Sequence, residues 1–122
     1  MGILVKRVYE PVAKADGFRV LVDRLWPRGL KKDAALLDQW AKELAPSTAL
    51  RQWFGHEPSR WEGFRHRYAG ELDGLAEQWR PLAERSTRHP LTLLYSARDE
   101  EHNNAVALKS YLDGWLRTHG PR

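Results

Sequence analysis

The sequence predicts an α/β protein, a small layered domain spanning residues 1–122 in which a short, mainly parallel or mixed sheet is flanked by helices. Three observations predict this class. Short apolar runs bounded by Gly or Pro alternate with segments of helical periodicity. A long helical segment separates the second run from the third, as in the connections between parallel strands. The length of 122 residues suits one domain with a single core.

Three segments are predicted to be strands. Residues 3–9 combine β-branched and aromatic residues with alternating apolar character. Residues 18–22 and 91–95 are largely apolar, which is typical of interior strands. The link at 10–17 is short for a parallel crossover, so the first two strands should either pair antiparallel or not be neighbours. The long helical link makes the second and third strands parallel.

The middle of the chain is predicted to be mostly helical. The segment 33–44 is ambiguous, because its apolar residues fit one helix face but it is short and can be partly extended. A helix should start at Pro46-Ser47 and stop at Gly55. From Pro58 to about Arg85, apolar residues recur at steps of three and four, which predicts a long amphipathic helix. We expect this stripe to be core rather than a cofactor site, and the helix to bend near Gly70, Gly74 or Pro81.

The chain is predicted to end in a helix that follows the strand at 91–95. Asp99 or Asn103 can serve as its N-cap. The tail, residues 119–122, is expected to be frayed.

The composition excludes several classes of site. The chain has no Cys, which removes thiol nucleophiles, Fe–S clusters and thiolate zinc sites. The five His are scattered without ligand spacing, so we expect no metal site, and no glycine fingerprint points to a cofactor. The N-terminus has neither the pattern of a signal peptide nor a spanning segment. We therefore expect a cytoplasmic protein that does not enter the membrane.

Positive charge gathers at the N-terminal end. The net charge is +4, and residues 1–32 hold eight basic and three acidic residues, a local excess of +5. Residues 33–122 hold the other 12 basic and 13 acidic residues, or −1. This asymmetry indicates either an anionic partner or a solvated basic face that aids solubility.

A candidate site follows from the predicted parallel strands, because ligands of open α/β sheets bind outside the carboxyl ends of the strands. One such end is the stretch 23–29, with a tight turn at Trp26-Pro27, and the other is 95–98. If both ends share one edge, the last helix aims its N-terminus at it. The residues assigned to ligand binding are Arg24, Trp26, Arg28, Ser96 and Arg98, and the candidates for proton transfer are Asp23, Tyr95 and Ser96. The structural alternative is that Asp23 pairs with an arginine to hold the turn and that Trp26 fills the core.

Several stretches form a recognisable set, namely residues 6–9, 16–17, 45–47, 50–51 and 91–97 and, within 21–29, the run Asp-Arg-Leu-Trp-Pro-Arg-Gly at 23–29. Together they resemble the YeaO-like branch of the family called domain of unknown function 488. The run at 23–29 is the most specific of them, and the resemblance extends to about Leu116. It implies a small, cytosolic α/β protein of bacteria or archaea, without an established activity. Many members of the branch read Asn-His-Ala where this chain has Asn103-Asn104-Ala105. Asn104 replaces that His, which argues against an acid–base or metal role there.

Three functions remain open at this point. The first is the binding of a small ligand that carries phosphate or carboxylate, with or without a reaction. The second is nucleic-acid binding, motivated by the N-terminal charge and by the fourteen arginines, although no nucleic-acid motif is present. The third is a protein-interaction domain that uses the Trp-rich helical segment.

Overall fold

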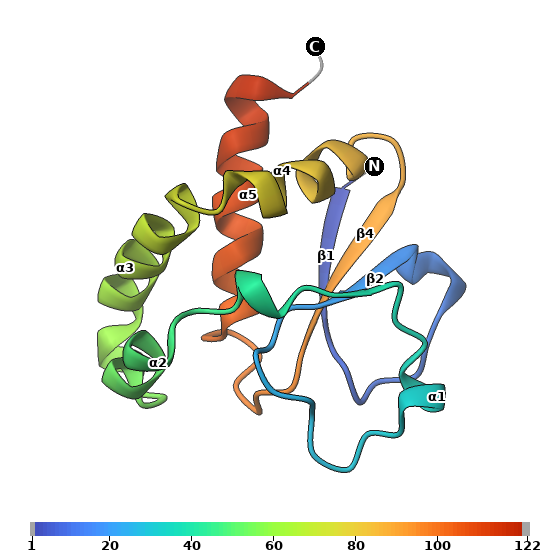
Figure 1. Ribbon diagram of the computed structural model, residues 1–122, viewed down its shortest axis with the longest axis horizontal. Helices are drawn as coiled ribbons and strands as arrows, with labels where there is room; N and C mark the ends of the chain where they lie inside the picture. Colours follow the sequence, from blue (N-terminus) through green and yellow to red (C-terminus); the bar gives the residue numbers. More distant parts are fainter. Residues whose placement is uncertain (1, 121–122) are drawn as a thin grey trace.

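A four-stranded parallel sheet forms the centre of the fold, with strand order β1-β4-β2-β3. The computed structural model describes residues 2–120. The strands are β1 Gly2–Arg7, β2 Phe18–Leu21, β3 Gln39–Trp40 and β4 Pro90–Tyr95. The helices are α1 Lys32–Ala35, α2 Thr48–Phe54, α3 Trp61–Asp73, α4 Ala76–Arg85 and α5 Asn104–His119 (Figure 1). Within residues 2–120, no helix is both long and apolar enough to cross a membrane.

The α/β fold class is confirmed, and every strand pair in the described residues is parallel rather than mixed. β4 lies between β1 and β2, so the first two strands are not neighbours, which was one of the two expected arrangements. β4 takes the central position because five of its six side chains are buried. In the register, Leu93 is paired with both Val5 and Val20.

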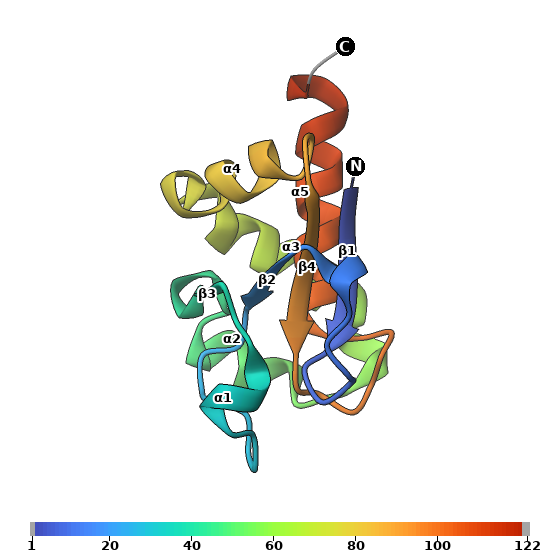
Figure 2. The same cartoon turned by 90° about the vertical axis from the view of Figure 1, so that its right-hand side faces the viewer.

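Helices α3, α4 and α5 cover one face of the sheet, and the long segment between β2 and β3, which includes the short helix α1, covers the other (Figure 2). Leu91, Leu93 and Tyr95 point toward α3, α4 and α5 in the main core. Leu94 points to the opposite face, where it packs in a smaller cluster with side chains of residues 26–40. The alternation along β4 thus produces two apolar layers.

The ambiguous segment 33–44 is divided between a helical turn and an extended strand. α1 ends after four residues at Leu36, whose φ is 46°, a left-handed conformation that stops the helix. The Leu36 side chain is 60% exposed, so it does not join the apolar helix face that the pattern indicated. The chain then extends into β3, which pairs with β2.

The predicted long helix is two helices. The break lies at Gly74, one of the three positions expected to bend, where the Gly74 N–H donates to the Glu71 carbonyl at 3.2 Å in a tighter turn. The expectation that the stripe is core is confirmed. Its buried members are Phe64, Tyr68, Leu72, Trp79 and Leu82.

The other helix boundaries follow capping chemistry. The Ser47 hydroxyl caps α2 by accepting from the Leu50 N–H at 3.1 Å, and Gly55 ends that helix at a φ of 53°. Asn103, not Asp99, caps α5 by accepting from the Val106 N–H at 3.0 Å. Of the expected frayed tail, His119 is the last residue of α5, and residues 121–122 lie outside the described part of the chain.

Half of the eight N-terminal basic residues are engaged within the fold. Lys6 and Arg19 both bind the buried carboxylate of Asp16. Arg7 holds the loop after β4, donating from Nε to the Ala97 carbonyl at 2.9 Å and from Nη2 to the Ser96 carbonyl at 3.1 Å. Arg24 is the fourth. The +5 excess is therefore only partly free to meet a partner.

Candidate functional site

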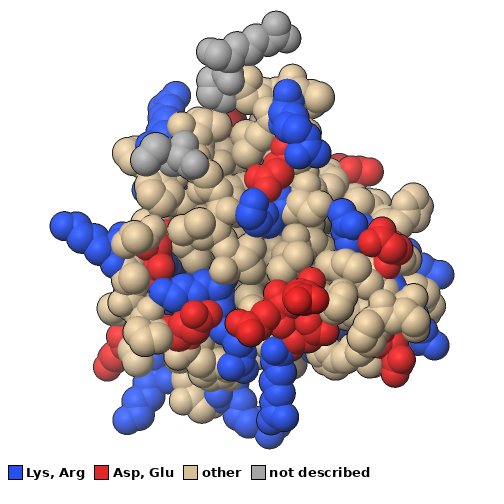
Figure 3. Space-filling model, turned by 180° about the vertical axis from the view of Figure 1, so that it is seen from behind, with Lys and Arg blue, Asp and Glu red and all other residues tan. Residues whose placement is uncertain are grey.

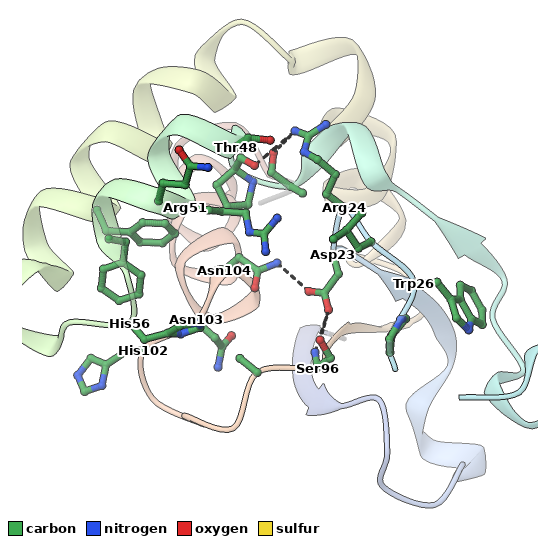
Figure 4. Close-up of a pocket in the computed structure, with 18 of the residues that line it drawn as sticks. Asp23, Arg24, Trp26, Thr48, Arg51, His56, Ser96, His102, Asn103 and Asn104 are labelled. Atoms are coloured by element: carbon green, nitrogen blue, oxygen red, sulfur yellow. Dashed lines mark hydrogen bonds between the residues drawn. The ribbon is translucent and has the colours of Figure 1, made fainter. Parts of the chain in front are cut away.

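A cleft of about 460 Å³ opens at the carboxyl ends of β2 and β4. Its lining comes from residues 23–28 after β2, residues 45–56 around α2, and residues 96–104 between β4 and the start of α5 (Figure 4). Phe64 of α3 also lines it. Because β2 and β4 are parallel, their carboxyl ends share one edge, where α5 begins. Three arginines and one aspartate supply the Arg, Lys, Asp and Glu charges of the lining, so the cleft is net positive.

Asp23 connects two of these stretches. Its Oδ2 accepts hydrogen bonds from the Ser96 backbone N–H at 3.0 Å and from the Ser96 hydroxyl at 2.6 Å. Its Oδ1 accepts one from Asn104 Nδ2 at 3.2 Å, and the same amide donates to the Val22 carbonyl at 2.8 Å. The carboxylate thus joins the end of β2 to the end of β4 and to the first turn of α5. Within residues 2–120 it forms no ion pair, so it does not hold the turn through an arginine.

Arg24 lies on the wall of the cleft and faces the start of α2. Its Nη2 donates long hydrogen bonds to the carbonyls of Ala45, at 3.3 Å, and Pro46, at 3.4 Å. Its Nε is buried and has no partner in the described residues. A buried donor without an acceptor costs about 1–3 kcal/mol of stability.

Arg51 is the residue that sequence reasoning missed. It comes from α2, and its guanidinium points toward the space between Asn104 and Asp23 (Figure 4). It forms no ion pair within residues 2–120. Thr48, three residues earlier, also lines the cleft, while Leu50, on the other side of α2, is buried. The available signal was therefore the polar face of an amphipathic helix, at spacing i, i+3.

Contacts with α3 fix the orientation of α2. The Ser47 backbone N–H and hydroxyl both donate to the carboxylate of Glu71, at 2.8 and 2.6 Å. The start of α2 is thereby tied to α3, which belongs to the main core. This attachment holds the Arg51 side of α2 toward the sheet edge.

Trp26 and Arg28 lie at the edge of the cleft. The Trp26 indole packs against Trp40, with ring centroids 5.3 Å apart, and donates to the Leu30 carbonyl at 2.7 Å. In Figure 4 it points away from Asp23, in keeping with the alternative that it fills the core. Arg28 is exposed, and its carbonyl accepts from the Tyr9 hydroxyl at 2.7 Å.

Two sequence candidates do not line the cleft. Tyr95 points into the main core with 2% of its surface exposed, and this burial is the main reason that its pKa is raised. Arg98 is exposed on the loop that follows β4. Of the residues predicted from the sequence, the cleft therefore brings together Asp23, Arg24, Trp26, Arg28 and Ser96.

His102 lies at the far end of the cleft from Trp26 (Figure 4). Its Nδ1 is 2.9 Å from Asp99 Oδ2, and its ring meets the ring of Trp61 edge-on, with centroids 5.2 Å apart. The backbone N–H groups of Glu101 and His102, together with the imidazole, lower the pKa of Asp99. Ser96 has no histidine partner within residues 2–120, because its hydroxyl donates to Asp23. A serine nucleophile activated by histidine is thus not formed here.

No metal centre is evident in the described part of the chain. Within residues 2–120, no three side chains of His, Asp or Glu converge closely enough to hold an ion.

The chain is similar to a protein family and to several bacterial proteins over nearly its whole length. The model of a protein family described as the inactive DUF488-N3 subclade matches residues 2–120. An Escherichia coli K12 protein, "Uncharacterized protein YeaO", is 46% identical over 118 residues, which cover 97% of this chain and 99% of the relative. "Uncharacterized protein Rv3073c" of Mycobacterium tuberculosis H37Rv is 40% identical over 114 residues, covering 92% and 94%. No solved structure matches.

Proposed function

Because this chain belongs to the DUF488 family and matches its subclade described as inactive, we propose that it binds a small anionic ligand in the cleft at the strand ends, without catalysing a reaction on it. The ligand carries a phosphate or a carboxylate. The proposal concerns the cleft lined by Asp23, Arg24, Arg51 and Ser96.

Arg51 carries the proposal. A guanidinium is charged at every physiological pH and offers five N–H donors in a planar fork that fits carboxylate and phosphate oxygens. Arg51 holds this fork over the cleft with no carboxylate of the described residues to neutralise it. The neighbouring Arg24 adds a second positive charge, and Arg28 adds a third at the edge. An anion in the cleft is attracted by all three positive charges.

The dimensions and walls also favour a small molecule. The volume of about 460 Å³ lies in the range of ligand pockets, roughly 300–1,000 Å³. Phe54 and Phe64 contribute buried aromatic rings to one side. Apolar walls exclude water, which strengthens hydrogen bonds between an arginine and an anion.

The state of the candidate catalytic groups favours binding over catalysis. Asp23 already accepts three hydrogen bonds, and the Ser96 hydroxyl is used as one of their donors. Tyr95 faces the core instead of the cleft. The Ser96 hydroxyl is thus occupied by Asp23 and Tyr95 does not reach the cleft, in keeping with the description of the subclade as inactive.

Nucleic-acid binding is less well supported than the binding of a small anion. Lys6, Arg7, Arg19 and Arg24 are engaged within the fold. Figure 3 shows acidic side chains set among the basic ones over the back of the molecule. A nucleic-acid surface needs a continuous basic stripe that releases counterions, and mixed charge weakens that effect.

The proposal is tested by thermal unfolding with inorganic phosphate, ethyl phosphate, propionate and a short oligonucleotide, each at low and at physiological salt. A ligand that binds only the folded state raises the midpoint, by about 2.7 kcal/mol of stabilisation at a hundredfold excess over Kd. We expect a shift with ethyl phosphate or propionate that survives physiological salt. It should be lost in Arg51→Met and retained in Arg88→Met, an exposed arginine at the opposite end of β4.

Two results contradict the proposal. A shift caused only by the oligonucleotide and removed by salt assigns the charge to nucleic-acid binding. Equal shifts in the Arg51→Met and Arg88→Met proteins place the anion outside the cleft.

A further inference from the structure

Opposite charges face each other across the cleft without forming an ion pair. The Arg51 guanidinium points toward the space beside the Asp23 carboxylate (Figure 4). Within residues 2–120, no nitrogen of Arg51 lies within 4.0 Å of a carboxylate oxygen. Both groups come from fixed elements, because α2 is tied to α3 by Glu71 and the Asp23 carboxylate is held by Ser96. The space between them therefore has hydrogen-bond donors on its Arg51 side and a carboxylate acceptor on its Asp23 side.

The Asp23 side of this space has spare acceptor capacity. A carboxylate offers about four lone-pair positions, and Asp23 Oδ1 is engaged by a single donor at 3.2 Å. The Asn104 amide donates to both the Val22 carbonyl and Asp23 Oδ1, which fixes its orientation. The Asn104 Oδ1 atom accepts no hydrogen bond from residues 2–120. An ammonium group placed here finds a negative charge and two acceptor atoms.

We infer that the ligand of the cleft is a small zwitterion, whose anionic group binds Arg51 and whose ammonium group binds Asp23 and Asn104. This inference rests on the proposed function and narrows its ligand class. The chemistry is shared by amino acids and by aminoalkyl phosphates. Phe54 and Phe64, which also line the cleft, supply apolar surface for the rest of such a molecule.

A zwitterion satisfies the cleft better than a simple anion of the same size. The simple anion meets Arg51 but lies near the negative charge of Asp23, which repels it. It also leaves the Asn104 oxygen unpaired once water is excluded, and an unpaired buried acceptor weakens binding. The added ammonium turns the repulsion into an attraction and supplies the missing donor.

Matched pairs of ligands test the inference on the unmodified protein. Calorimetric or NMR titration compares phosphoethanolamine with ethyl phosphate, and L-alanine with propionate, so that each pair differs by one ammonium group. We expect the zwitterion of at least one pair to bind about tenfold tighter, since hydrogen bonds between charged groups are worth that much in net affinity. Ethylamine serves as the cationic control and should bind more weakly than either zwitterion.

A substitution at Asp23 provides a second test, because it should affect the affinities for the zwitterion and for the simple anion differently. Asp23→Asn keeps an acceptor for Ser96 but removes the negative charge. We expect Asp23→Asn to weaken the binding of phosphoethanolamine and to leave the binding of ethyl phosphate equal or tighter. The ratio of the two dissociation constants should then fall to about threefold or less. Arg51→Met should weaken both members of the pair.

The possible outcomes distinguish the claim that the cleft binds an anion from the claim that its ligand is a zwitterion. If ethyl phosphate and propionate bind as tightly as their zwitterionic partners and depend on Arg51, the zwitterion inference is overturned while anion binding stands. If no compound binds, both are overturned. If ethylamine binds as tightly as the zwitterions, the ligand is a cation and both are again overturned.

Discussion

Removing the Asp23 side chain should destabilise the whole protein, because this carboxylate is the junction of the cleft. Asp23→Ala deletes the acceptor for the Ser96 N–H, the Ser96 hydroxyl and the Asn104 amide. The bond from the Trp40 indole to the Asp23 backbone carbonyl, at 2.7 Å, is retained. At about 1 kcal/mol for each lost hydrogen bond, the free energy of unfolding should fall by about 3 kcal/mol.

The expected loss is large enough to measure in two ways. For a chain of this length it corresponds to a fall in Tm of about 12 °C. Urea denaturation followed by Trp fluorescence and by circular dichroism gives the same difference from the shift of the midpoint, provided that the m-value is unchanged.

A matched control identifies the cause. Asp33→Ala removes an exposed aspartate of the same N-terminal region and should change the stability by less than about 0.5 kcal/mol. If Asp23→Ala is as stable as the Asp33→Ala protein, the junction at Asp23 does not hold the strand ends together, and the reasoning is refuted.

Further substitutions test other parts of the fold. Gly17→Ala should cost about 3 kcal/mol or more in a denaturant titration, because Gly17 has a φ of 63° and an added Cβ meets the Pro90 carbonyl oxygen. Gly70→Ala, in α3 with open space around it, should instead be neutral or stabilising by up to about 1 kcal/mol, and an equal loss in both variants contradicts this account. Burial alone would raise the pKa of Asp16, but the Ala13 N–H, Lys6 and Arg19 lower it below its ordinary value of 3.8. The stability from Asp16 is therefore present above pH 3.8 and is lost as the pH falls through the lower folded-state value. Acid titration of stability should show a fall below that pH that is smaller in Asp16→Asn, and identical profiles for the two proteins speak against the Asp16 ion pairs.

The sequence revealed those elements whose pattern is local. Residues 18–22 and 91–95 were recognisable as interior strands, because each is an apolar run between breakers. β3 was not recognisable, since two residues carry no pattern and their extended form depends on pairing with β2. The break between α3 and α4 was expected only as a bend, because an apolar stripe continues across Gly74 in the sequence while the backbone does not.

The site was foreseeable where it depends on strand ends. Asp23 and Arg24 follow β2 after Val22, and Ser96 follows β4 directly, so the parallel arrangement was enough to bring them to one edge. Arg51 was not foreseeable in the same way, because its position depends on how α2 packs against α3 through the Ser47–Glu71 contact. No local pattern encodes which face of a short helix turns toward a distant sheet edge.

The direction of a side chain is also set by tertiary contacts. Arg24 was expected to hold an anion, yet it also reaches the carbonyls of Ala45 and Pro46, a contact between residues far apart in the sequence. Trp26 was given two roles, and its packing against Trp40 depends on the unexpected strand β3.

The most direct test of the account is an NMR titration of ¹⁵N-labelled protein with phosphoethanolamine, in which the Arg51 side-chain Nε–H and the backbone amides of Ser96 and Asn104 are followed. We expect these three signals to move together with one dissociation constant, and the exposed Arg88 side chain at the other end of the sheet to stay unchanged. Movement confined to surface lysines such as Lys31 and Lys32, with the three cleft signals unchanged, would contradict the claim that the cleft at the strand ends is the binding site.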